Sequence, residues 1–176
     1  MPRKFSLRGT ISGADNSIIW ATNPIFDYVS TDRTKAWRVV SAYLWPATWD
    51  GGTTSDGQTM IAGVLHTDYV KFTSWNELSD VRDNRTFGWL QAGMKNVDNG
   101  GDDFLAPQSL NTMPQFTIDP DTIIVKELWL SVATKMENQS INGNRDWSYL
   151  IILEEMKLTP SESVFQQIKG MGQDVE

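Results

Sequence analysis

The chain has 176 residues, no cysteine and a formal net charge of −7. This length suits one domain with its own core, and the lack of cysteine excludes disulfides, thiolate metal sites and a cysteine nucleophile. The acidic balance argues against a broad phosphate-binding surface, which needs clustered Lys and Arg side chains. We therefore expect residues 1–176 to form a single domain that folds in a reducing compartment.

The basic residues of the N-terminus are Arg3, Lys4 and Arg8. No apolar segment of signal-peptide type follows them, and no later run approaches the roughly 18 apolar residues of a membrane span. We therefore expect a mature chain that starts near Met1 and has no transmembrane segment. With so few basic residues, we expect at most a weak contact with nucleic acid, made by Arg3, Lys4 and Arg8.

The first half of the chain predicts several strands. Apolar and polar residues alternate over 5–12, which is typical of a half-buried first or edge strand. The short apolar runs 18–20 and 25–29 are strands or packed loops. The segment 36–45 predicts a strand that ends at Pro46. Its alternation places Trp37, Val39, Tyr43 and Trp45 on one face.

The middle of the chain alternates strands with long loops. The loop 46–57 carries Trp49 at an otherwise polar place. The segment 58–67 predicts a strand with Ala62 and Gly63 at its middle, which suits close sheet packing or a bend. A capping-box pattern that contains Trp75 predicts a short helix near 75–82. A further strand is predicted over 86–94, followed by a loop at 95–114.

The most apolar long segment with clear ends is 119–136, and its partner is 147–158. The ten residues between them are polar or turn-forming and include an Asn-Gly step, so we predict that the two runs are adjacent antiparallel strands at the centre of the sheet. A helix starting near residue 119 is the alternative, because apolar residues of the first run also recur every fourth position.

The C-terminal segment predicts a helix over 160–169 and then a loose acidic tail. Thr159 is placed as N-cap, Pro160 in the first turn, and Glu162 three residues after the cap. The apolar stripe of this helix consists of Val164, Phe165 and Ile168. Because two turns of helix do not persist alone, we expect the stripe to dock on the chain's own sheet or on a neighbouring subunit.

Residues for catalysis are scarce. His66 is the only histidine, lies in a predicted strand and is interpreted as structural. No nucleophile elbow, P-loop or dinucleotide motif occurs. Calcium ligation in the loop containing Asp98, Asp102 and Asp103 is an alternative, but the spacing lacks the EF-hand order, which favours a solvated loop. We therefore predict no enzymatic activity, no metal and no cofactor.

Seven or eight strands with long connections and only short helices predict an all-β protein. The expected architecture is an antiparallel β-sandwich, of jelly-roll type in preference to immunoglobulin type. Two functions remain open: self-assembly, and carbohydrate binding by displayed Trp residues in a β-sandwich module. The candidate interface residues are Trp45, Trp49, Trp75, Val164, Phe165 and Ile168.

This layout, all-β and Cys-free with long inter-strand loops and a short terminal helix, resembles that of the viral single jelly-roll capsid proteins. The resemblance covers the whole chain and implies a structural, self-assembling virion protein that is made in the host cytoplasm and contacts itself and other virion proteins. It implies no catalytic residue. Many capsid proteins of small-genome viruses have a long Arg-rich N-terminal arm. In this chain only Arg3, Lys4 and Arg8 could take its place. A phage tail or spike domain is the nearby alternative.

Overall fold

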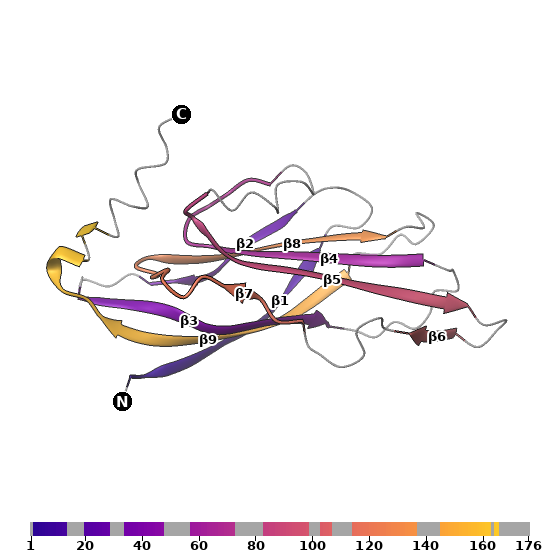
Figure 1. Ribbon diagram of the computed structural model, residues 1–176, viewed down its shortest axis with the longest axis horizontal. Coiled ribbons are helices and arrows are strands. Elements are labelled where there is room, and N and C mark those ends of the chain that lie inside the picture. The colour runs from indigo at the N-terminus through magenta and orange to yellow at the C-terminus, as the bar shows by residue number, and fades with distance from the viewer. Residues whose placement is uncertain are drawn as a thin grey trace.

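The computed structural model describes residues 2–13, 20–28, 34–47, 57–72, 83–98, 103–106, 114–136, 145–162 and 164–165. Among these residues the strands are β1 (Lys4–Gly13), β2 (Ala21–Asp27), β3 (Lys35–Pro46), β4 (Gly57–His66), β5 (Thr86–Asp98), β6 (Asp103–Ala106), β7 (Thr117–Ile118), β8 (Glu127–Met136) and β9 (Arg145–Lys157) (Figure 1). The described secondary structure is almost entirely β-strand, which confirms the predicted fold class.

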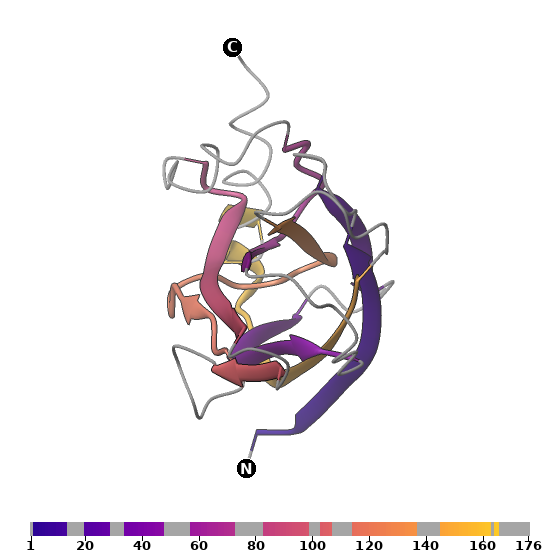
Figure 2. The same ribbon diagram turned by 90° about the vertical axis from the view of Figure 1, so that its right-hand side faces the viewer.

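The strands form two antiparallel sheets that pack face to face as a sandwich (Figure 1, Figure 2). In the described part of the chain, one sheet has three strands in the order β1-β9-β3. The other has six strands, in the order β2-β8-β4-β5-β6 with β7 also paired to β5. Leu44 of β3, Leu130 of β8 and Ile151 of β9 are fully buried, so the core lies between the sheets.

The segment 114–124 connects the two sheets. Leu44 N–H donates to the Pro114 carbonyl at 3.0 Å, and Ile124 and Trp37 exchange backbone hydrogen bonds of 2.7 and 2.9 Å. Between these points β7 pairs with β5. The segment therefore serves as an interrupted fourth strand beside β3. With it, the sheets are β1-β9-β3-(114–124) and β2-β8-β4-β5 with short β6 at its edge, which is the arrangement of a jelly roll.

The predicted central hairpin is wrong, although both of its strands exist. β8 pairs with β2 and β4 in the six-stranded sheet, whereas β9 lies between β1 and β3 in the other. The chain thus crosses from one sheet to the other between the two strands. The helical alternative for 119–136 is also wrong, since β8 begins at Glu127 and the preceding residues join the edge of the other sheet.

A bulge in β3 overturns the predicted arrangement of its large side chains. The register between β3 and β9 shifts between Val39 and Ser41, and one extra residue reverses the alternation of faces. Trp37 and Val39 therefore point into the core and are 6% and 4% exposed. Tyr43 and Trp45 lie beyond the bulge and point away from the core, partly exposed.

The predicted C-terminal helix begins at its predicted cap. Residues 160–162 and 164–165 are helical. Thr159 Oγ1 accepts the N–H of Glu162 at 3.3 Å, and Glu162 Oε2 accepts the N–H of Thr159 at 2.8 Å, which is the reciprocal capping box. The rest of the predicted helix at 160–169, and the predicted helix at 75–82, lie outside the described residues.

Candidate functional site

The outer side of the three-stranded sheet carries apolar side chains in a position where polar residues are usual. They are Tyr43 and Trp45 of β3 and Leu150 and Ile152 of β9, and we call this set the outer apolar face. Each alternates along its strand with side chains that point into the core, and each is partly exposed. Tyr43 pairs directly with Leu150, so these side chains adjoin across the two strands.

Polar and charged residues border the outer apolar face. On β1, Arg8 lies beside Leu150 in the ladder. Toward one end of β9, Arg38 Nη2 donates to Glu154 Oε2 at 2.7 Å. The Arg38 side chain is 41% exposed, so this pair orients the two side chains more than it stabilises the fold. An apolar centre within a polar rim is the usual composition of a protein contact surface.

Of the predicted interface residues, Trp45 belongs to the outer apolar face. Val164 and Phe165 lie on the helical turn after β9 and are 52% and 66% exposed. Neither is therefore docked on the chain's own sheet, which removes one of the two predicted receiving surfaces. Trp49, Trp75 and Ile168 lie outside the described residues.

Leu150 and Ile152 were not among the predicted interface residues. Their segment, WSYLIIL, is apolar on both faces, and it was predicted to be a strand at the centre of the sheet. In a two-layer sandwich only one face of a strand reaches the core. An apolar run on both faces of such a strand is therefore the signal that could have indicated a second contact surface.

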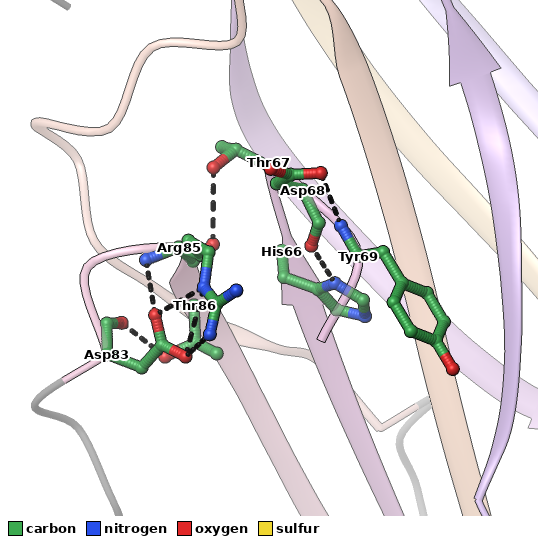
Figure 3. Close-up of polar contacts among 7 residues, drawn as sticks. All are labelled: His66, Thr67, Asp68, Tyr69, Asp83, Arg85 and Thr86. Carbon is green, nitrogen blue, oxygen red and sulfur yellow. Dashed lines mark hydrogen bonds and ion pairs between the residues drawn. The ribbon is translucent and has the colours of Figure 1, made fainter. Parts of the chain in front are cut away.

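His66 is fully buried at the end of β4, and both of its ring nitrogens have partners. Nδ1 lies 2.6 Å from the Asp68 carbonyl oxygen (Figure 3), and Nε2 lies 2.8 Å from Ser131 Oγ. Because a carbonyl only accepts, Nδ1 carries the proton and Nε2 accepts from the Ser131 hydroxyl. Burial lowers the pKa of His66 to about 4, so the ring is neutral. Ser131 is also fully buried, so the pair is structural, as predicted for this histidine.

The turn before β5 is held by Asp83 and Arg85 (Figure 3). Arg85 donates from Nε to Oδ1 of Asp83 at 3.0 Å and from Nη2 to Oδ2 at 2.8 Å, while the Asp83 carbonyl accepts the Thr86 hydroxyl at 2.8 Å. Burial raises the pKa of Asp83, but the hydrogen bonds and charge of Arg85 outweigh this effect and hold it below its usual value. The two side chains satisfy each other and stabilise the turn.

Within the described residues, no group of three or more His, Cys, Asp or Glu side chains forms a metal site. Asp102 and the side chains of Asp98 and Asp103 lie outside that part of the chain, so calcium ligation there stays an untested alternative. The described residues also contain no helix long and apolar enough to cross a membrane.

The three basic residues near the N-terminus are exposed. Lys4 and Arg8 lie within β1 rather than in a segment before the first strand. The Arg3 carbonyl accepts a hydrogen bond from Glu155 N–H at 2.8 Å, so the strand pairing extends to this residue. Their weak contact with nucleic acid remains a prediction.

No protein-family model matches the chain, and no curated protein matches its sequence. Solved structures do match. The VP1 of Trichodysplasia spinulosa-associated polyomavirus is 11% identical, with a TM-score of 0.45, over 90% of this chain and 96% of that chain. Chimpanzee polyomavirus VP1 is 7% identical, with a TM-score of 0.45, over 89% and 96% of the two chains. A structure from Desmodium yellow mottle tymovirus is 14% identical, with a TM-score of 0.38, over 90% and 89%.

The likeness is one of fold. All three structures come from viruses. At these identities and TM-scores the likeness carries no information about what this chain binds.

Proposed function

We propose that this chain is a structural virion protein that assembles with copies of itself and has no catalytic activity. The observation that carries the proposal is the outer apolar face, because a sheet that already has a core on its other side has no need of apolar residues there. In this role the protein resides in the virion, is made in the host cytoplasm, and contacts other virion proteins besides its own copies.

The size of the outer apolar face bears on the kind of contact it makes. Fully burying a large apolar side chain is worth roughly 1.5–3 kcal/mol, and these four are already partly buried, so only a part of that gain remains for association. A stable interface covers about 800 Å² on each partner. Four side chains supply only part of such an area, so we expect the contact to include the polar rim and β1.

Leu150→Lys is expected to abolish the higher oligomers. Leu150 lies at the centre of the outer apolar face, and a lysine there remains hydrated in the free chain but loses its hydration when a neighbour covers it. Size-exclusion chromatography with light scattering measures the loss of mass, and negative-stain microscopy measures the loss of particles. The melting temperature is expected to fall only slightly: the side chain points away from the core, but the new lysine lies directly opposite Arg8 of β1.

Gln91→Lys is the matched control. Gln91 is exposed on β5 of the other sheet, so the variant carries the same added positive charge away from the outer apolar face. It is expected to assemble like the unmodified chain. A wild-type chain that stays monomeric at high concentration across salt and pH would remove the support for self-assembly, as would a Leu150→Lys variant that assembles normally.

Carbohydrate binding is the alternative function, in a β-sandwich module or a phage tail or spike domain. Sugar faces stack on displayed aromatic rings, and Tyr69 is 49% exposed with its ring 5.4 Å from that of Trp129, edge to face. Trp49 and Trp75, from which this alternative was predicted, lie outside the described residues. Glycan-array binding that is lost in Tyr69→Ala and retained in Leu150→Lys would favour the alternative.

Phe165→Ala is expected to change the unfolding free energy of the monomer by no more than about 0.5 kcal/mol, because the ring is 66% exposed. The melting temperature of the monomer is therefore expected to stay nearly the same. It is expected to lower the oligomer mass, because the remaining receiving surface for the helix belongs to a neighbour. Calorimetry at low concentration and light scattering at high concentration separate the two effects. A clear fall in the monomer melting temperature would mean that the ring docks on its own chain.

A further inference from the structure

The sandwich has four sheet edges, and they differ in how they are closed among the described residues. The outer edge of β3 is bridged by Gln115 and Ile124. β2 carries Pro24 and a register shift before Phe26, and β6 has only 4 residues. Short strands, prolines and bulges are the devices that protect sheet edges from pairing with another chain. These three edges are therefore closed or protected.

The edge of β1 lacks these devices. Its ten residues pair with β9 in one unbroken register, and the strand contains no proline. It is an end strand of its sheet, and no described strand pairs with its other side. Figure 2 shows β1 running along one side of the molecule. A regular unpaired edge of this length is a template for strand addition.

One hydrogen bond shows which backbone groups of β1 face the open edge. Glu155 N–H donates to the Arg3 carbonyl, so Arg3 and every second residue after it direct their backbone groups toward β9. The intervening residues direct their N–H and C=O groups away from β9. These residues are Lys4, Ser6, Arg8, Thr10 and Ser12, and all of them are exposed.

We propose that β1 pairs antiparallel with β1 of a second copy across a two-fold axis, which joins the two three-stranded sheets into one continuous sheet. An isologous contact of this kind requires an edge that is complementary to itself, and a regular strand edge meets this condition in the antiparallel direction. The pairing belongs to the self-assembly of the proposed function and rests on it. It also places the outer apolar faces of both copies on one continuous surface.

The charges of β1 are compatible with this pairing. Lys4 and Arg8 are its charged residues, and like charges directly opposite each other destabilise a sheet. With the axis at Leu7, Arg8 lies opposite Ser6 of the second copy and Lys4 lies opposite Thr10, so no two charges lie directly opposite each other. In the same register Phe5, which is 44% exposed, lies opposite Gly9 of the second copy and gains a neighbour on the inner side.

The experiment starts from Leu150→Lys, which removes the outer apolar face as a contact, and adds Thr10→Pro. Proline at Thr10 removes an N–H that points to the open edge, and edge strands tolerate proline at such positions. Thr10→Ala is the matched control because it changes the side chain and keeps the N–H. Light scattering is expected to give about twice 19.9 kDa for Leu150→Lys with or without Thr10→Ala, and 19.9 kDa when Thr10→Pro is added.

Circular dichroism of each variant confirms that the fold is retained. If Thr10→Pro does not fold, Ser6→Pro with Ser6→Ala as its control replaces it, because Ser6 has the same orientation. A monomeric Leu150→Lys variant, or a proline variant that still forms the dimer, would overturn the edge pairing. In either case the proposed function would still be supported if the wild-type chain forms particles and the Leu150→Lys variant does not. The proposed function itself fails if the wild-type chain stays monomeric, or if Leu150→Lys assembles normally.

Discussion

Gly63→Val is expected to destabilise the fold by about 3 kcal/mol, at the upper end of the usual cost of overpacking a core. Gly63 is buried on β4, and a Cβ atom built there would lie 2.8 Å from Cζ and 3.0 Å from Cε1 of Phe116. The Phe116 ring has little freedom to retreat, because its backbone N–H is bound to the Ala42 carbonyl at 2.9 Å and the residue is 4% exposed. The close approach of ring and backbone therefore requires glycine at this position.

Urea denaturation of a double-mutant cycle measures this contact. Phe116→Leu shortens the side chain and is expected to cost stability by itself, but the cost of Gly63→Val in that background is expected to be smaller than in the unmodified chain. Gly63→Ala is the milder control, and it is expected to destabilise the chain less than Gly63→Val does. Additive costs in the cycle, or a Gly63→Val chain as stable as the original, would show that the ring is not the obstacle.

The same glycine illustrates what the sequence was able to predict. Strands were found where alternation and breakers are local signals: the strand predicted over 36–45 is observed as Lys35–Pro46, and the one predicted over 58–67 is observed as Gly57–His66. Ala62 and Gly63 suited close packing or a bend at the middle of that strand, and the contact of Gly63 with Phe116 shows close packing there. The capping box at Thr159 was likewise a local signal, and the structure confirms it.

Which strands pair with one another is not a local property. The eight residues between β8 and β9 fit a long hairpin loop, and they equally fit a crossover between two sheets whose separation is about 10 Å. The sheet to which each strand belongs depends on its hydrogen-bonding partners. These are β2 and β4 for β8, and β1 and β3 for β9. These partners are distant in sequence, so the turn residues alone led to the wrong topology.

The candidate site was found only in part, for a related reason. Trp45 was a predicted interface residue, but the alternation placed Tyr43 and Trp45 on the same face as Trp37, whereas the structure turns them to the opposite face. A bulge of one residue carries no strong signal in a run of apolar side chains, yet it reverses every later position of the strand. The bulge in β3 is therefore what turns Tyr43 and Trp45 outward and creates half of the outer apolar face.

The stability of the protein is expected to fall steeply as the pH decreases from 6.5 to about 4, and His66 is the expected cause. Burial lowers its pKa in the folded chain to about 4, whereas an unfolded histidine has a pKa of 6.5. Between these values the unfolded chain binds the additional proton, so the free energy of unfolding rises with pH throughout this window. At 1.36 kcal/mol per pKa unit, the full loss is on the order of 3 kcal/mol.

The groups around His66 do not reverse this expectation. The bond to the Asp68 carbonyl and the charges of Asp83 and Asp68 raise the pKa, and Arg85 lowers it, but burial remains the largest effect. Protonation would also replace the hydrogen-bond acceptor at Nε2 with a donor, facing a Ser131 hydroxyl that at present donates to it. The folded chain therefore accepts the proton only at the cost of breaking this arrangement.

His66→Gln separates the histidine from the carboxylates that titrate in the same range. A glutamine amide donates to the Asp68 carbonyl and accepts from Ser131 without a charge, and His66 is the only histidine of the chain. Urea denaturation at pH 7 is expected to show the variant somewhat less stable than the unmodified chain, with the difference shrinking or reversing toward pH 4.5. Equal pH dependence of the two chains would show that the buried histidine does not control acid stability.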